Sequence, residues 1–316
     1  MVETRWHTCS TSLRMWLDAV AAGHRLAGRV ARLLSVSEHP SPDLADPATD
    51  PMEVARAAAR VIAERTGAER HDVALVLGSG WGETADRIGE TLAEIDNIEV
   101  PGFAMAAVAG HSGTMRSVAI GDTGRRALVF RTRTHYYEGR GVRAVVHAVR
   151  TAAAAGCSTV VLTNGCGGLR EEWSAGTPVL ISDHINLTAA SPLEGATFVD
   201  LTDLYSPRLR AIAREVDPDL DEGVYVQFRG PQYETPAEVR MAARIGGDLV
   251  GMSTTLEAIA ARHAGLEVLG ISLVTNPAAG IATSPLSHEE VIEAGQEAAA
   301  RCGDLLASIV GRLQGG

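Results

Sequence analysis

The chain has 316 residues, of which 46% are hydrophobic and 21% are charged, so it can bury a sizeable core and is not expected to be disordered. Its net charge of −11 argues against a protein that binds nucleic acid through a broad basic face. None of its 28 basic residues is a lysine, which excludes Schiff-base chemistry on lysine and the lysine of a nucleotide-binding P-loop.

Residues 1–50 are interpreted as an extension outside the fold, either poorly ordered or produced by a start codon upstream of Met52. A transit peptide is the alternative, but such peptides contain few acidic residues, and Glu3 and Asp18 interrupt this basic stretch. Residues 51–316 show no linker and no internal repeat, so we expect them to form a single domain. The four scattered cysteines lack a CxxC pair, which favours a reducing cytoplasm over a disulfide framework or a metal site.

From residue 52 onward, helical and strand patterns alternate, and apolar runs that end in glycine indicate buried strands. The predicted helices span 52–67, 142–156, 206–216, 235–246, 255–265 and 288–313. The predicted strands span 72–80, 116–121, 126–131, 158–168, 176–182, 222–228, 248–253 and 267–276. This alternation predicts an α/β domain with a central sheet flanked by helices on both faces.

The segment RTRTHYYEG (131–139) is predicted to extend a strand with an unusual polar face. Because alternate side chains share a face of a strand, one side would carry Arg131, Arg133, His135 and Tyr137. A core strand of an acidic protein has no packing use for such a stripe. We therefore expect this face to line a binding site.

Four predicted strands end in loops that deliver Gly, Ser or Asn: VLGSGWG, VLTNGCGG, LVGMS and LVTNPAAG. Ligands of α/β sheets bind where strands end, and glycines let main-chain N–H groups approach an anion. The first loop is GxGxG rather than the GxGxxG of dinucleotide sites, so phosphate binding by Ser79 is favoured over a nucleotide cofactor. A tight turn is the purely structural alternative. His111, within GHSG, carries little weight alone.

Eight motifs follow one another along residues 54–312: GSGWG, GHSG, RTHYYEG, TNGCGGL, DHINL, GPQYETPAE, VGMST and SLVTNPAAG with SHEEV. Together they resemble the trimeric class of the purine nucleoside phosphorylases. The resemblance implies a nucleoside phosphorylase catalytic domain with a mixed, partly barrel-like sheet, and cleavage of 6-oxopurine nucleosides by phosphate. It implies a homotrimer, no organic cofactor and no metal.

The resemblance also assigns site residues by number. Phosphate would be bound by Ser79, His111, Arg133, His135, the main chain of Gly165, and Ser253. The ribose would contact Tyr137, Met252 and His288, and the base would contact Glu234, Asn276 and Tyr233. Catalysis would rest on Asn276, Glu234 and His135. An ionised Glu234 accepts from N1–H of a 6-oxopurine, and Asn276 stabilises the charge that develops on the leaving base.

Two departures from the family pattern concern the site. Cys166 stands beside the phosphate loop where relatives commonly carry alanine. The loop before TDLY is short, which leaves Phe198 as the aromatic side chain that would close the site of a neighbouring subunit.

Other interpretations remain open. Ser287 and Glu290 fit a capping box at a helix start, and Glu234 fits a favourable charge in a first helical turn. A methylthioadenosine phosphorylase is the alternative enzyme, and it would be expected to carry aspartate in place of Asn276. A non-catalytic purine-binding homologue is the alternative from another class, and it would lack phosphate ligands.

Overall fold

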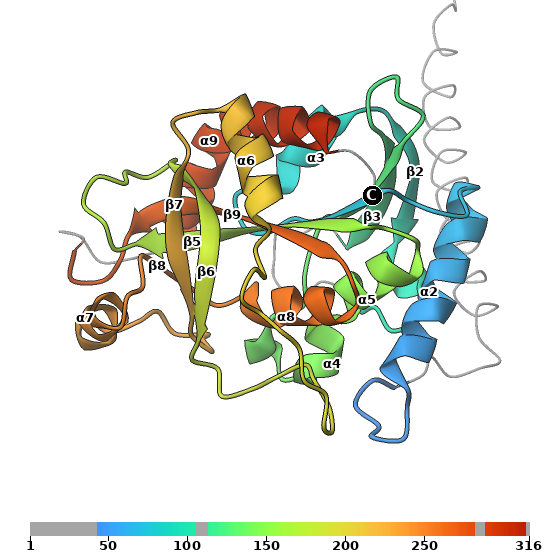
Figure 1. Ribbon diagram of the computed structural model, residues 1–316, viewed down its shortest axis with the longest axis horizontal. Helices are drawn as coiled ribbons and strands as arrows, with labels where there is room; N and C mark the ends of the chain where they lie inside the picture. The colour runs from blue at the N-terminus through green and yellow to red at the C-terminus, as the bar shows by residue number, and fades with distance from the viewer. Residues whose placement is uncertain (1–42, 105–112, 282–287, 314–316) are drawn as a thin grey trace, which may run out of the picture. The chain divides into compact units, whose positions relative to one another are not determined.

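The structure is a computed structural model that describes residues 43–104, 113–281 and 288–313 (Figure 1). Within these ranges, nine strands form one sheet in the order β2-β3-β4-β1-β5-β8-β7-β6-β9. The strands are β1 (Val73–Val76), β2 (Thr91–Asp96), β3 (Thr114–Ala119), β4 (Arg126–Phe130), β5 (Thr159–Gly168), β6 (Pro178–Asn186), β7 (Asp221–Gln227), β8 (Leu249–Gly251) and β9 (Glu267–Pro277).

Part of this sheet closes on itself. Strand β9 lies beside β6 at the end of the strand order, and it also pairs in parallel with β5 along the whole length of β5. The strands β5, β8, β7, β6 and β9 therefore form a closed barrel, while β1, β4, β3 and β2 continue from β5 as an open sheet. This confirms the expected mixed, partly barrel-like sheet.

Helices lie on both faces of the whole sheet, with α3, α6 and α9 on one side and α4, α5 and α8 on the other (Figure 1). The helices are α2 (Pro51–Thr66), α3 (Ala85–Ile88), α4 (Gly141–Val145), α5 (His147–Ala154), α6 (Pro207–Val216), α7 (Pro236–Arg244), α8 (Thr255–His263) and α9 (His288–Arg312). Short 3₁₀ turns are η1 (Gly82–Thr84), η2 (Asn97–Glu99) and η3 (Tyr136–Glu138).

Strand β1 shows why two helical layers are needed. Ala74 and Val76 pack into the apolar cluster that contains Val149 of α5. Val73 and Leu75 pack into a second cluster on the α9 side. Because successive side chains of a strand point to opposite faces, a wholly apolar strand requires cover on both.

The residues before α2 are anchored to the domain. Asp50 caps α2, with its Oδ1 accepting from the N–H of Met52 at 2.8 Å. The guanidinium of Arg143 donates to the carbonyl oxygens of Asp46 and Thr49, each at 2.9 Å. A chain that began at Met52 would therefore lose the helix cap and these contacts.

The strand predicted across 131–139 is wrong, because β4 ends at Phe130. Phe130 pairs with Met115 of β3 on one side and with Val76 of β1 on the other. Strand β1 ends at Val76 and β3 begins at Thr114, so among the described residues no ladder continues beside 131–139. The chain continues irregularly into η3.

Two further elements differ from expectation. The edge strand β2, whose residues are mostly exposed, lacks the apolar pattern that predicts a strand. The helix expected over 142–156 is interrupted at Val146, where ψ is 7°, and so forms α4 and α5. The remaining helices and strands are present near their predicted positions.

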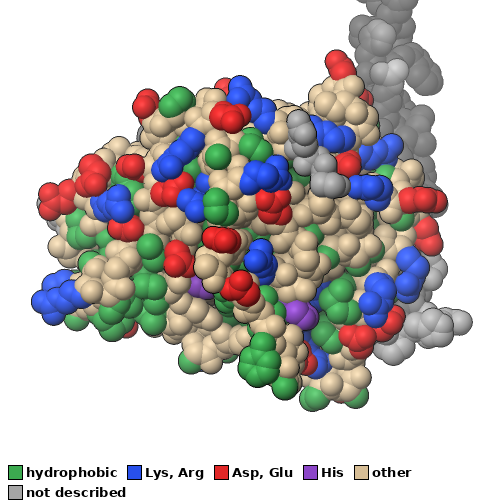
Figure 2. Space-filling view, in the orientation of Figure 1, with side chains coloured by type: hydrophobic (Ala, Val, Ile, Leu, Met, Phe, Trp, Pro, Cys, Tyr) green, Lys and Arg blue, Asp and Glu red, His purple; other side chains and the backbone are tan. Residues whose placement is uncertain are grey.

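In the part of the chain that is described, no helix has the length and apolar character needed to cross a membrane. On the visible face, arginines are interspersed with Asp and Glu rather than gathered together (Figure 2).

Candidate active site

A cavity of about 340 Å³ lies where several strands end. The neighbouring strands β4, β1, β5 and β9 run parallel, so their carboxyl ends meet at one edge of the sheet. Arg133 follows β4, Ser79 follows β1, and Gly165 and Asn276 lie towards the ends of β5 and β9. The loop after β8 adds Met252.

Ten of the residues predicted from the sequence line this cavity: Ser79, Arg133, His135, Tyr137, Gly165, Tyr233, Glu234, Met252, Ser253 and Asn276. His111 and the side chain of His288 lie outside the described residues, so their roles stay predictions. Arg133, His135 and Tyr137 converge on the cavity from an irregular segment and η3, and not through the pleat of a strand.

The guanidinium of Arg133 is held from behind. Its side chain is 2% exposed, its Nε donates to Oε1 of Glu257 at 3.1 Å, and its Nη1 donates to the carbonyl of Thr163. Its buried Nη2 has no hydrogen-bond partner among the described residues. Because Arg133 lines the cavity, this remaining donor can bind an anion there.

The GSGWG loop packs tightly against this arginine. A Cβ on Gly78 would lie 2.6 Å from Nη1 of Arg133 and 2.6 Å from the carbonyl oxygen of Thr163. The buried Trp81 donates through Nε1 to the main chain of β5 at 2.9 Å. Gly78 and Trp81 are therefore needed for packing, and Ser79 between them forms part of the cavity wall.

Ser253 precedes a strained helix start. Thr254 caps α8 with φ 80° and ψ −48°, a region that residues other than glycine rarely adopt. Its N–H donates to Oε2 of Glu257 and its Oγ1 accepts from Nδ2 of Asn164, each at 2.9 Å. Beneath them, the hydroxyl of the buried Tyr225 accepts from the N–H of Ser253 at 3.3 Å.

The rings of His135 and Tyr137 stack with their centroids 4.8 Å apart. Oε1 of Glu138 accepts from the N–H of His135 at 2.7 Å and lies 3.5 Å from Nδ1 of that ring. Burial acts to raise the pKa of Glu138, but the hydrogen bonds from His135 outweigh it and the pKa is lowered. Burial raises the pKa of Tyr137, which therefore keeps its hydroxyl proton.

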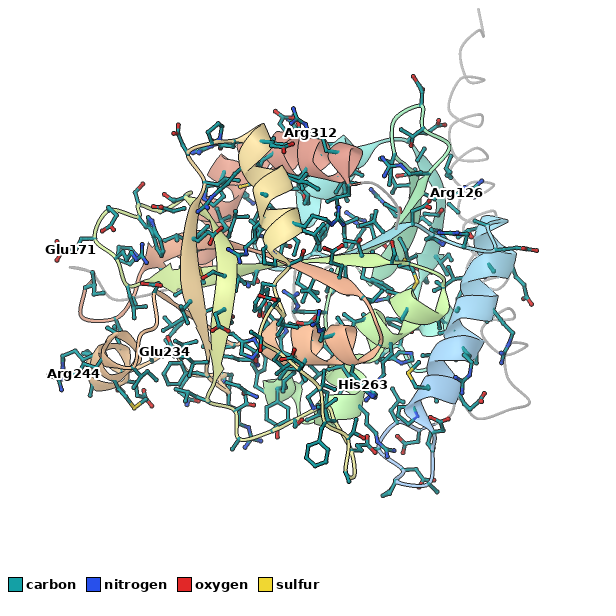
Figure 3. All side chains as sticks on the ribbon, viewed as in Figure 1. Arg126, Glu171, Glu234, Arg244, His263 and Arg312 are labelled. Atoms are coloured by element: carbon teal, nitrogen blue, oxygen red, sulfur yellow. The ribbon has the colours of Figure 1, made fainter. Side chains whose placement is uncertain are left out.

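Glu234 lies in the loop just before α7 (Figure 3). Burial, with a smaller contribution from Glu238, raises the pKa of Glu234. Its buried Oε1 has no hydrogen-bond partner among the described residues, an arrangement that is costly unless a ligand supplies a donor. The N-terminus of α7 is capped by Thr235 and Glu238, so the helix does not require Glu234.

Thr275 and Asn276 both line the cavity, although neighbours in a strand normally point to opposite faces. Cys166 pairs with Val274 and Gly167 pairs with Asn276, so the register shifts and β9 carries one extra residue. This β-bulge brings both side chains to the site. Oγ1 of Thr275 donates to Oδ1 of Asn276 at 2.8 Å, which orients the amide.

Several residues of the wall were missed by the sequence interpretation: Asn164, Gly167, Pro231, Val250, Gly251, Thr275 and Ala278. Each is adjacent to, or within three residues of, a predicted site residue, and this proximity is the signal that could have found them. Cys166 also lines the cavity, and burial raises the pKa of its thiol to about 12. It is therefore a neutral thiol.

Comparisons with known proteins agree with this geometry. The model of the phosphorylase superfamily matches residues 72–311. Over 275 residues the chain is 68% identical to a purine nucleoside phosphorylase from Cellulomonas sp, covering 86% of this chain and 98% of the relative. The chain belongs to the purine nucleoside phosphorylase family. All the cavity-lining residues of this phosphorylase lie within the matched range.

Other relatives of this phosphorylase have similar coverage. A purine nucleoside phosphorylase from Mycobacterium tuberculosis is 58% identical over 270 residues, covering 85% of this chain and all of the relative. Isoform 2 from Schistosoma mansoni, solved with cytosine and ribose-1-phosphate, has a TM-score of 0.75 at 30% identity and covers 83% of this chain and 97% of its own. A schistosoma enzyme solved with hypoxanthine has a TM-score of 0.74, also at 30% identity, with 83% and 98% covered.

Proposed function

We propose that this chain catalyses the phosphorolysis of inosine, guanosine and their 2′-deoxy forms to the free purine and (deoxy)ribose 1-phosphate, a reaction of purine salvage. One observation carries the proposal: a single cavity contains a buried guanidinium with an unused donor and a buried carboxylate with an unused acceptor. Phosphate matches the guanidinium of Arg133, and the N1–H of a 6-oxopurine matches the carboxylate of Glu234.

We call the walls around phosphate the anion side, formed by Ser79, Arg133, His135, Gly165 and Ser253, with His111 as a further proposed donor. Phosphate accepts hydrogen bonds from these groups and attacks C1′ of the ribose as the glycosidic bond breaks. A guanidinium and fixed dipoles suit a phosphate without help from a metal. We therefore propose phosphate as co-substrate, with neither a metal nor an organic cofactor.

We call the walls around the purine the base side, formed by Tyr233, Glu234 and Asn276. Ionised Glu234 accepts from N1–H, and Asn276 donates to N7 as negative charge develops on the leaving base. Tyr233 packs against the purine. Between the two sides, the ribose contacts Tyr137 and Met252, and His288 is proposed to bind its 5′ hydroxyl.

The solved relatives support this division. One was solved with ribose-1-phosphate and another with hypoxanthine, which are the two products that inosine phosphorolysis yields. Both align over more than four fifths of this chain.

The direct test is an assay of hypoxanthine release from inosine with and without phosphate. We expect release only when phosphate is present, together with formation of ribose 1-phosphate. A protein that binds inosine but releases no hypoxanthine with phosphate would be the non-catalytic alternative. Guanosine, adenosine and methylthioadenosine are assayed in parallel, and a preference for the last would favour the alternative enzyme.

Asn276→Asp tests the assignment of the base side. An aspartate accepts from a 6-amino group more readily than an amide does, so adenosine turnover should rise relative to inosine turnover by about tenfold. The ratio of kcat/KM for the two nucleosides is the measurement. An unchanged ratio would mean that Asn276 does not contact the base.

We also propose a homotrimer in the cytoplasm. Phe198 is 93% exposed, and a large exposed aromatic is a natural contact for a partner subunit. In the trimer, Phe198 closes the ribose part of a neighbouring site. The described cysteines Cys157, Cys166 and Cys302 are free thiols, which suits a reducing compartment.

A further inference from the structure

A buried carboxylate behind the anion side connects several of its walls. Glu257, in the first turn of α8, has a side chain that is 1% exposed and does not line the cavity. Its Oε1 accepts from Nε of Arg133 at 3.1 Å, and its Oε2 accepts from the N–H of Thr254 at 2.9 Å. Thr254 directly follows Ser253, and its Oγ1 accepts from Asn164 in the wall of β5.

These contacts leave Arg133 one defined orientation. Nε of Arg133 donates to Glu257, and its Nη1 donates to the carbonyl oxygen of Thr163. Nη2 is the nitrogen without a partner among the described residues. A long side chain with many rotamers is thus fixed with one end of its fork free for a ligand.

The same carboxylate holds the turn that carries Ser253. Thr254 has φ 80°, and such a conformation persists only when the surrounding contacts enforce it. The bond from its N–H to Glu257 and the bond from Asn164 to its Oγ1 are two of these contacts. Ser253 is therefore placed by the same group that places Arg133.

We propose that Glu257 is a positioning residue for the phosphate site. It fixes the donors of Arg133 and Ser253 before the anion arrives, so little free energy is spent on rearranging them when the anion binds. This inference rests on the proposed function, in which the anion is phosphate. Glu257 does not touch the substrate and acts only through its neighbours.

Charge and positioning predict opposite results for Glu257→Gln. Glu257 and phosphate are both negatively charged. If only this repulsion mattered, removal of the charge of Glu257 would tighten phosphate binding. Glutamine has only one acceptor oxygen, so it cannot hold both Arg133 and the N–H of Thr254. If Glu257 acts by positioning, phosphate binding becomes weaker although a charge that repels phosphate has been removed.

The experiment measures KM for phosphate and KM for inosine in Glu257→Gln. We expect KM for phosphate to rise by about tenfold to a hundredfold, because small misplacements of a binding group have effects of this size. KM for inosine should change by less than about twofold, as expected for a wall that binds only the anion. A KM for phosphate that is unchanged or lower overturns the proposal.

Asp248→Asn is the matched control. Like Glu257, Asp248 accepts from an arginine Nε, that of Arg170 at 2.8 Å, and from a main-chain N–H, that of Val224 at 2.9 Å. It does not line the cavity. The Asp248→Asn substitution should lower Tm and leave KM for phosphate unchanged. A similar rise of this KM in both variants would show a general effect of instability and overturn the proposal.

A second variant keeps the test valid if Glu257→Gln folds poorly. The second variant combines Glu257→Gln with Thr254→Gly. Glycine adopts φ 80° freely, so Thr254→Gly should restore the stability that Glu257→Gln loses, without restoring the contact to Arg133. A KM for phosphate that stays above that of Thr254→Gly alone supports positioning of Arg133. Recovery to the level of Thr254→Gly would show that Glu257 only caps α8.

Arg133→Ala separates the two levels of inference. If Arg133→Ala leaves KM for phosphate unchanged, the phosphate site itself is wrongly assigned. If Arg133→Ala raises this KM while Glu257→Gln does not, the site is correct and only the role of Glu257 is wrong.

Discussion

The anion side and the base side of the cavity are built in different ways. On the anion side, Arg133 and Glu257 form a buried ion pair with side chains 2% and 1% exposed, and there is no room for a Cβ at Gly78 beside them. On the base side, Tyr233 is 39% exposed and Glu234 presents an oxygen without a partner among the described residues.

The difference follows the two substrates. Phosphate is identical in every turnover, so its donors can be fixed in advance by main-chain and carboxylate contacts. Purines differ in their edge groups, and selection among them relies on a polar group that only the correct base satisfies. The anion side should therefore be sensitive to small changes of shape, whereas the base side should be sensitive to changes of charge.

Gly78→Ala should have the largest effect. The added Cβ would lie 2.6 Å from Nη1 of Arg133, so the guanidinium must move, and we expect kcat/KM for phosphate to fall by about a hundredfold. The control is Gly82→Ala in the same loop, where a Cβ meets no atom within 4 Å. Equal losses in both variants, measured by varying phosphate, would show that the anion side is no more tightly packed than its surroundings.

Glu234→Gln should have the next largest effect on activity. A neutral amide replaces the charged acceptor of N1–H, so kcat/KM for inosine should fall by about thirtyfold while KM for phosphate stays within about twofold. Glu238→Gln, which changes a partly exposed carboxylate of the same helix start that does not line the cavity, is the control and should retain activity. Loss of phosphate affinity in Glu234→Gln would mean that the two sides are not independent.

The Glu234→Gln variant should also be more stable than the parent protein at neutral pH. Burial raises the pKa of Glu234 in the folded protein, so its protonated form favours folding below the unfolded value of 4.5, and that contribution is lost as pH rises through the folded pKa. Glu234→Gln should therefore unfold with about 1 kcal/mol more free energy at pH 8, and with no gain near pH 4. Thermal melts across this pH range give the comparison, and a gain that persists at pH 4 would exclude the carboxylate as its cause.

Arg131→Ala should have the smallest effect. Arg131 is absent from the cavity wall, and its Nη1 lies 3.4 Å from Oγ1 of Thr114 and 3.8 Å from Oε1 of Glu94. We expect a loss of stability of at most about 1 kcal/mol and an unchanged KM for phosphate. A sharp rise of that KM would place Arg131, rather than Arg133, at the phosphate.

Much of the site could be predicted because it lies where strands end. An apolar run that stops at glycine marks both a buried strand and the start of a loop, so Ser79, Gly165 and Asn276 were found together with their strands. Arg133 and His135 were also found, although the strand proposed to carry them was wrong. Their residue types predicted a binding site, and both line the cavity although the geometry was misjudged.

What sequence could not predict depends on contacts between distant segments. The end of β4 is set by where β1 ends and β3 begins, which no local pattern encodes. Glu257 has the spacing of an ordinary capping residue after Thr254, and only the fold brings Arg133 to it across 124 positions. The bulge at Thr275 likewise appears only in the pairing of β9 with β5.

The register of the β5–β9 ladder also fixes a distance across the cavity. Gly165 pairs with Leu273 and Gly167 with Asn276, so the main chain separates Gly165, the proposed phosphate donor, from Asn276, the proposed base contact, by two residues, about 7 Å along the strands. Exchange of side chains alters which base is accepted but leaves this length unchanged. Because phosphate would attack the same carbon that the base leaves, this spacing has to suit the reaction at C1′ for every purine, and an insertion or deletion in either strand would change it whereas a substitution would not.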